Sequence, residues 1–172
     1  EGDQDDLDKI ITEVTDGKLK IYTHNHASTK GKVSVKVTVK KLEALSVAGS
    51  GNIKFTSDLN TEEFDLELSG SGNISIPTIN AEEIELSLAG SGDIKMGGVA
   101  EEFELSIAGS GNVDCAELKA AEVEVNIAGS GDARVWATGE LESNIVGSGT
   151  VIYKGNPEVD AETSGSGKTQ PL

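Results

Sequence analysis

Apolar and polar residues alternate strictly in short runs that recur along the last three quarters of the chain. In each run the apolar side chains stand two residues apart with polar residues between them, as in residues 64–68, 84–88, 103–107 and 123–127. An interval of two is the period of a β-strand with one buried and one wet face. The pattern therefore predicts a series of half-buried strands and excludes a helical solenoid.

The tripeptide Gly-Ser-Gly follows each run and occurs seven times, with successive copies 21, 20, 19, 20, 18 and 18 residues apart. A shorter alternating strand comes after each copy, for example at Ile74 and Ile76. A period near twenty residues marks a solenoid whose coils bury their apolar faces against one another. Equivalent strands run the same way in every coil, so we predict a single-stranded parallel β-helix of about six to seven coils, right-handed under the crossover rule.

The glycines of the repeat are predicted to be structural turn residues. A sharp bend at each coil needs positive φ and a close approach to the neighbouring backbone, which glycine tolerates because it has no Cβ. The predicted turn glycines are Gly49, Gly51, Gly70, Gly72, Gly90, Gly92, Gly109, Gly111, Gly129, Gly131, Gly147 and Gly149.

Residues 1–48 follow another pattern. Two alternating runs flank Asp16-Gly17, a favoured hairpin turn, and residues 33–39 alternate valine with polar residues as a further strand would. A solenoid end exposes unpaired backbone that such a segment can cover. We therefore predict an N-terminal antiparallel β cap over residues 1–48, within the same domain as a parallel β-helix over residues 49–172.

The net charge of −16 falls entirely on the predicted solenoid. Residues 1–48 carry eight acids and eight lysines, whereas residues 49–172 carry 22 acids and six bases. Such a surface repels phosphate backbones, so nucleic acid is not an expected partner. The apolar runs are much shorter than the roughly 18 residues that span a bilayer, and no transmembrane segment is predicted. The chain begins on Glu1 without a basic, apolar leader, which we interpret as a processed or trimmed start.

Two rows of acids flank the first inward residue of the second strand of each coil. The rows are Glu63, Glu83, Glu102, Glu122, Glu140 and Glu158, and Asp65, Glu85, Glu104, Glu124, Glu142 and Asp160. One interpretation is a solvated face that keeps an exported protein soluble. The other is weak Ca²⁺ binding, with Glu83, Glu85, Glu102, Glu104, Glu122 and Glu124 as candidate ligands.

Other candidate residues have structural explanations. Asp93 after its glycines is similar to a calcium-binding β-roll turn, but the period is about twenty residues rather than nine. His24 and His26 are spaced to share a metal, yet no third ligand follows, and we interpret them as loop histidines. Cys115 falls in an inward column, where a thiol is inert. We predict no cofactor and no catalytic residue.

Trp136 is the one candidate interface residue. It follows inward Val135 and aligns with Thr56, Pro77, Gly97 and Ala116 at a corner of the coil. We therefore expect it to point outward, and an exposed tryptophan is a frequent interface anchor.

The repeat unit Ala89-Gly90-Ser91-Gly92-Asp93-Ile94, preceded by the strand at residues 84–88, resembles the autotransporter-adhesin head (GIN) family of exported β-proteins from Gram-negative gut bacteria. Residues 7–21 and 149–157 resemble the opening and closing regions of that family. The family has further strands ahead of Leu7, so we expect an incomplete cap here. The resemblance implies an exported protein, periplasmic, anchored to the outer membrane or on the cell surface, and carries no catalytic residues.

These observations predict a non-enzymatic, adhesin-like β-helix that binds proteins or glycans, host-derived ones included, through an elongated acidic surface. The alternative is a structural envelope scaffold that self-associates end to end as a homo-oligomer. A third hypothesis is a polysaccharide-processing enzyme, but the single arginine and scattered bases disfavour a grip on acidic sugars.

Overall fold

The structure is a computed structural model that describes residues 1–24 and 28–172. It forms two compact units, Glu1–Lys40 and Lys41–Leu172. The first solenoid strand, β3, starts at Ala44, a few residues before the predicted boundary at 49. The capping role of the N-terminal segment stays a prediction.

The N-terminal unit contains a short helix and a hairpin. Helix α1 (Gln4–Leu7) precedes β1 (Ile10–Thr15) and β2 (Lys18–Thr23), which pair antiparallel as predicted. Both turn residues have positive φ, 51° at Asp16 and 77° at Gly17, which is the geometry that an Asp-Gly turn favours.

The strand predicted at residues 33–39 is wrong. This segment has no strand assignment, and Val35, Val37 and Val39 are each about half exposed. Alternation fits a segment to a sheet only where another strand supplies the hydrogen bonds, and the described residues pair no strand with this one.

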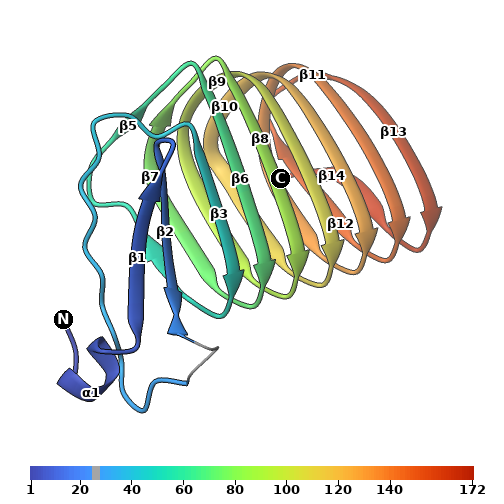
Figure 1. The fold of residues 1–172 in the computed structure, drawn as a ribbon. Helices are drawn as coiled ribbons and strands as arrows, with labels where there is room; N and C mark the ends of the chain where they lie inside the picture. The colour runs from blue at the N-terminus through green and yellow to red at the C-terminus, as the bar shows by residue number, and fades with distance from the viewer. Residues whose placement is uncertain (25–27) are drawn as a thin grey trace. The chain divides into compact units, whose positions relative to one another are not determined.

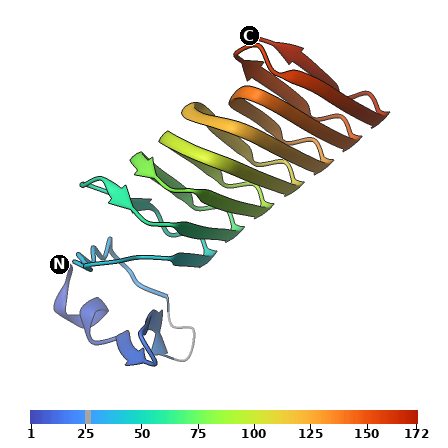
Figure 2. The same cartoon turned by 90° about the horizontal axis from the view of Figure 1, so that it is seen from above.

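The solenoid unit is a stack of parallel coils of about seven turns, which confirms the predicted fold class (Figures 1 and 2). The predicted handedness stays a prediction. The strands are β3 (Ala44–Gly49), β4 (Ile53–Lys54), β5 (Leu59–Asn60), β6 (Glu63–Gly70), β7 (Asn73–Asn80), β8 (Glu83–Gly90), β9 (Asp93–Gly109), β10 (Asn112–Gly129), β11 (Asp132–Gly147), β12 (Thr150–Lys154), β13 (Glu158–Gly165) and β14 (Lys168–Pro171).

Each complete coil has a first and a second strand segment; the coil after the first Gly-Ser-Gly also has the two-residue strand β5, and the last coil has only the first segment, β14. The first segment follows Gly-Ser-Gly, and the second segment precedes the next copy; β9, β10 and β11 each run through both. Equivalent residues pair in parallel register from coil to coil, as Leu86 does with Leu66 and Leu105. The register predicted from the sequence period is confirmed for the second segments.

A continuous apolar column fills the interior, because every second side chain of both segments points inward. Phe64, Leu86 and Phe103 are at most 2% exposed. The column becomes smaller and partly polar toward the C-terminal coils, where buried Ser143 shares a 2.9 Å hydrogen bond with Thr169. The interior thus ends on side chains that can satisfy each other's hydroxyl groups.

The bends between the coils require glycine, but only the first glycine of each Gly-Ser-Gly has the predicted positive φ; from the second copy onward, the second glycine lies close to the backbone of the coil before it. Gly90 has a φ of 126°, and a Cβ there would collide with the carbonyl oxygen of Gly70 one coil back. Gly51 in the first Gly-Ser-Gly is different, since a Cβ there would meet nothing within 4 Å. The close approach begins only where another coil lies directly behind the turn.

Candidate functional site

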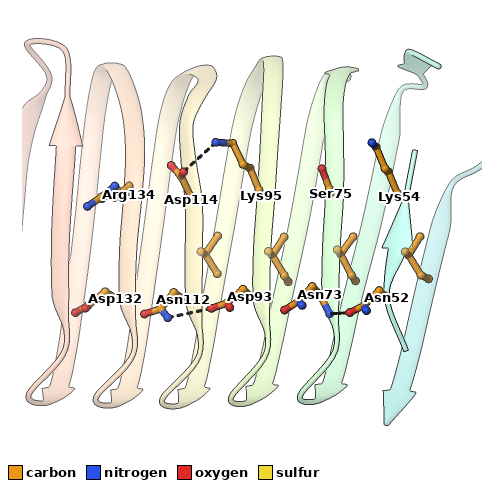
Figure 3. A pocket seen from close by; sticks show the side chains of 14 residues that line it. Asn52, Lys54, Asn73, Ser75, Asp93, Lys95, Asn112, Asp114, Asp132 and Arg134 are labelled. Atoms are coloured by element: carbon orange, nitrogen blue, oxygen red, sulfur yellow. Dashed lines mark hydrogen bonds and ion pairs between the residues drawn. The ribbon is translucent and has the colours of Figure 1, made fainter. Parts of the chain in front are cut away.

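The outward face of the first segments, here called the first-segment face, carries two parallel rows of polar side chains (Figure 3). One row, the amide row, consists of Asn52, Asn73, Asp93, Asn112 and Asp132. The other, the cation row, consists of Lys54, Ser75, Lys95, Asp114 and Arg134, which are neighbours in the strand register. The rows line an open hollow of about 580 Å³.

Hydrogen bonds between coils occupy the amide row. The Asn112 side-chain amide donates to Asp93 Oδ1 at 2.9 Å, and the backbone N–H of Thr150 donates to Asp132 Oδ1 at 2.9 Å. The backbone N–H of Asn73 likewise donates to Asn52 Oδ1 at 3.1 Å. The amide row therefore links adjacent coils by hydrogen bonds, and its two carboxylates, Asp93 and Asp132, each accept one from a neighbouring coil.

The cation row is more open to solvent. Lys95 Nζ lies 3.4 Å from Asp114 Oδ2, and both side chains are well exposed. Within the described part of the chain, Lys54 and Arg134 have no carboxylate within ion-pair distance. Two of the three cations on this row are therefore available to an external anion.

Trp136 lies at the edge of this face, two residues after Arg134 on β11. The strand register places Lys119 and Lys154 on either side of it. Lys154 Nζ lies 3.7 Å from the ring centroid, and Lys119 Nζ lies 6.0 Å from it. Each contact is a cation–π interaction, worth roughly 0.5–1 kcal/mol at an exposed site.

The sequence alignment of Trp136 with Ala116 is wrong. The register shifts between Asp114 and Lys119, so that Trp136 pairs with Lys119 instead. Trp136 is half-buried rather than freely exposed. The sequence places Lys119, Trp136 and Lys154 at the same corner of three successive coils. The β10 corner is longer than the β11 corner, however, so a simple alignment does not bring Lys119 and Trp136 together. The interface role of Trp136 stays a prediction.

The outward face of the second segments, the second-segment face, carries the two predicted rows of acids in register. Partial loss of hydration, followed by repulsion from Glu102 and Glu63, raises the pKa of Glu83. The pKa of Glu104 is raised for the same reasons, with Glu124 as its strongest repulsive neighbour. Like charges on adjacent strands oppose folding here.

The calcium candidates Glu83, Glu85, Glu102, Glu104, Glu122 and Glu124 all lie on this second-segment face. They come from adjacent strands and face water. Among the described residues, no group of three or more histidine, cysteine or acidic side chains has the geometry to hold a metal ion. Calcium binding stays a prediction.

The remaining sequence candidates lie apart from these faces. Cys115 is fully buried, and burial raises the pKa of its thiol, so the nucleophilic thiolate is disfavoured. His24 is exposed at the end of the hairpin, and His26 lies outside the described residues.

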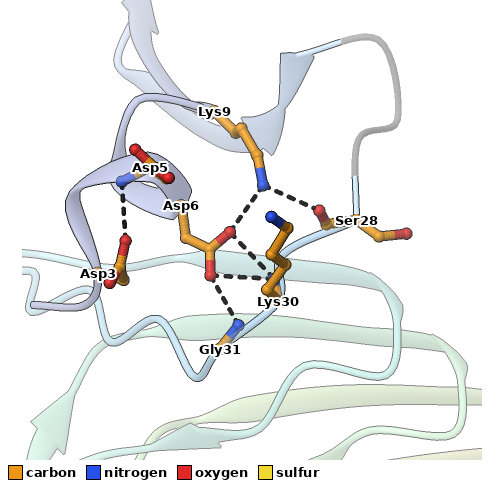
Figure 4. Close-up of polar contacts among 7 residues, drawn as sticks. All are labelled: Asp3, Asp5, Asp6, Lys9, Ser28, Lys30 and Gly31. Atoms are coloured by element: carbon orange, nitrogen blue, oxygen red, sulfur yellow. Dashed lines mark hydrogen bonds and ion pairs between the residues drawn. The ribbon is translucent and has the colours of Figure 1, made fainter.

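A buried carboxylate in the N-terminal unit has no signal in the sequence pattern (Figure 4). Asp6 accepts hydrogen bonds from Lys9 Nζ at 2.7 Å, from the Lys30 N–H at 3.0 Å and from the Gly31 N–H at 2.7 Å. The bond from Lys9, followed by the two backbone bonds, lowers the pKa of Asp6 to about 2. Asp6 fixes α1 to the segment around Lys30, which is a structural role.

The profile of the family described as "putative auto-transporter adhesin, head GIN domain" matches residues 1–157. Among curated proteins, none matches. No helix of the described residues is long and apolar enough to cross a membrane.

Solved structures with the same fold support this assignment. A "putative lipid binding protein" from Parabacteroides distasonis is 31% identical with a TM-score of 0.83, over 99% of this chain and 82% of that one. A "putative adhesin" from Bacteroides fragilis is 26% identical with a TM-score of 0.91, over 96% of this chain and 78% of that one. A second P. distasonis protein, also a "putative adhesin", is 28% identical with a TM-score of 0.83, over 99% and 82% of the two chains.

Proposed function

The chain belongs to the auto-transporter adhesin head GIN domain family, and from that premise we propose that it is a non-enzymatic, adhesin-like binding domain of the cell envelope or cell surface. Its partner is a protein or a glycan. The proposed location is outside the cytoplasm, in the periplasm, at the outer membrane or on the cell surface.

The observation that carries this proposal is the first-segment face. Hydrogen bonds between coils hold its amide row in place, and Lys54 and Arg134 beside that row have no ion-pair partner among the described residues. Polar groups that are already held in place on a rigid sheet lose less freedom on binding than mobile groups do. On the second-segment face, which composition favours as the binding surface, the two acidic rows repel one another beside a band of serine, asparagine and alanine side chains.

The non-enzymatic part of the proposal rests on the chemistry of the side chains. The one thiol is buried with a raised pKa. The carboxylates of the second-segment face form uniform rows, whereas glycoside hydrolysis needs one pair of carboxylates in two different environments.

An array that presents glycans, matrix proteins and lipid vesicles tests the proposal. The vesicles are included because one structural relative is described as a lipid-binding protein. We expect selective binding to a glycan or a protein, and a loss of that binding when Lys54, Lys95 and Arg134 are changed together to glutamine.

Three results would contradict the proposal. Turnover of a glycan would identify an enzyme. Filaments that lengthen with protein concentration, without binding to any probe, would identify the structural scaffold. Binding that is lost only on changes to the second-segment face would move the site to the acidic rows.

A further inference from the structure

The bases of the solenoid are confined to one side of its coils. Residues 49–172, all of which the structure describes, contain six bases. All six lie on first segments or on the corner that follows them, and none lies on a second segment: Lys54, Lys95, Lys119, Arg134, Lys154 and Lys168. The bases that look scattered along the sequence, and for that reason seemed unsuited to binding acidic sugars, therefore gather on one side of the coils of an otherwise acidic solenoid.

The cation row has a regular spacing. Lys54, Lys95 and Arg134 occupy every second coil, and Ser75 and Asp114 occupy the coils between them. Neighbouring strands lie about 4.8 Å apart, so the cations recur at roughly 9.6 Å along the stack. A partner that uses all three needs negative charges at the same interval.

The same face carries three acids, Asp93, Asp114 and Asp132, beside its three bases, so the cations act locally and not through a net positive charge. Asp93 and Asp132 accept hydrogen bonds from the next coil, and Asp114 is the only acid in the cation row. Lys54 and Arg134 stand near the two ends of the cation row, and both line the hollow (Figure 3). The two nearest further cations, Lys119 and Lys154, extend the positive region beyond Arg134 around Trp136.

We propose that the first-segment face binds a linear polysaccharide that carries one carboxylate on every second sugar ring and lies across the strands. The proposal requires an extended chain whose rings advance by about one strand spacing, roughly 4.8 Å per ring, so that its carboxylates meet Lys54, Lys95 and Arg134 in turn. The uncharged rings between them lie over Ser75 and Asp114. The amides of the amide row offer donors and acceptors to the sugar hydroxyl groups.

This inference rests on the proposed function, because it names the ligand class of the same face. It does not extend to nucleic acid, whose phosphates recur at every nucleotide and would meet Asp114 as well as the cations. The net charge of −16 repels any polyanion at long range, so binding depends on the local cations and is of modest affinity.

The single tryptophan makes the test direct, because Trp136 lies beside Arg134 and beneath Lys154. Hyaluronan fragments, in which glucuronate alternates with an uncharged amino sugar, serve as the probe. Polygalacturonate with a carboxylate on every ring, neutral dextran and a single-stranded oligonucleotide are the comparison probes. Binding is followed by Trp136 fluorescence and by calorimetry.

We expect hyaluronan fragments to bind more tightly than the three comparison probes. The triple variant Lys54→Gln, Lys95→Gln, Arg134→Gln should bind about tenfold more weakly, the sum of three exposed ion pairs. The matched control Lys18→Gln, Lys20→Gln, Lys36→Gln removes the same charge from the N-terminal unit and should bind unchanged. A melting curve of each variant checks that the fold is intact.

A variant that binds more tightly than the wild type must be folded, so a second test uses a change that should strengthen binding. The change Asp114→Asn removes the only acid of the cation row and releases Lys95 from its ion pair. We expect binding about two- to threefold tighter, the value of one exposed pair.

Several outcomes would overturn the inference. Equal losses in the triple variant and its control would show a general charge effect, and equal binding of polygalacturonate or the oligonucleotide would refute the spacing. If a protein or a neutral glycan binds and the triple variant loses it, the proposed function stands while this inference fails. If no probe of the array binds, both fail.

Discussion

The two outward faces of the solenoid are built on the same coils, but side chains of adjacent coils repel one another on one face and form hydrogen bonds on the other. On the second-segment face, acids stand in register with acids, and repulsion contributes to the raised pKa of Glu83 and Glu104. On the first-segment face, three amides and two carboxylates share the amide row, and Asn112 donates to Asp93. A repeat fold thus tolerates a repulsive face where another face and the interior hold the coils together.

The largest loss of stability is expected from a change in the apolar interior, on which both outward faces rest. Leu86 is buried between Leu66 and Leu105, and Leu86→Asp puts an unpaired charge there. We expect a loss of about 4 kcal/mol or more in the free energy of unfolding, measured with denaturant.

Two control variants bracket this result. Leu86→Met keeps the volume and should cost less than about 1.5 kcal/mol. Glu85→Lys changes an adjacent outward residue and should be tolerated. Equal losses from Leu86→Asp and Glu85→Lys would contradict the inward register.

The next largest effect is expected at the turn that separates the two faces. Gly90→Ala introduces a Cβ at a φ of 126° and against the Gly70 carbonyl. We expect a loss of about 2–4 kcal/mol in the free energy of unfolding. Gly51→Ala, with open space around its Cβ, should change it by less than about 0.5 kcal/mol. Similar losses at both positions would contradict the close-approach argument.

A smaller effect, on the melting temperature Tm, is expected from removing charges, and it should differ between the two faces. The double variant Glu104→Gln, Glu124→Gln relieves repulsion, and we expect its Tm to rise by about 2 °C. Lys95→Gln on the first-segment face should leave Tm unchanged within about 1 °C. Added NaCl should raise the Tm of the wild type more than that of the double variant, since salt screens the acids.

The same melting curves test calcium. Millimolar Ca²⁺ that stabilises no more than NaCl of equal ionic strength would rule out calcium binding at the predicted acids. An excess that disappears in the double variant would support it.

The smallest effects are expected from pH. Because the folded-state pKa values of Glu83 and Glu104 are raised, their ionised forms oppose folding, and stability should rise as the pH falls from 7 toward 4.5. The pKa of Asp6 is lowered from 3.8 to about 2, so its contribution is present above pH 3.8 and is lost as the pH falls through 2.

Variants assign these two responses. Glu83→Gln with Glu104→Gln should flatten the rise in Tm between pH 7 and 4.5, and Asp6→Asn should flatten the loss of stability between pH 4 and 2. A wild-type Tm that falls steadily from pH 7 would contradict the effect of the raised carboxylate pKa values.

Periodicity in the sequence predicts most of the solenoid. Alternation places Leu66, Leu86 and Leu105 in one inward column, and the Gly-Ser-Gly spacing predicts the stack of coils. Both signals are strong because one coil after another repeats the same local environment.

Features that depend on a single coil are not predictable in this way. The extra residues in the β10 corner hide the pairing of Trp136 with Lys119, and no repeat marks Asp6. The valine run at 33–39 has the period of a strand but pairs with no strand among the described residues, and pairing cannot be deduced from one segment alone. The confinement of bases to first segments is visible in the sequence only after the two segments are separated.

The parallel stacking of the coils has a mechanical consequence. The hydrogen bonds between coils point along the stack, so tension applied in that direction loads one coil boundary after another. A coil that detaches frees about twenty residues, or roughly 70 Å of extended chain. Under a pulling force the solenoid should therefore lengthen in steps of nearly equal size and dissipate work at each step, like a series of links that open in turn.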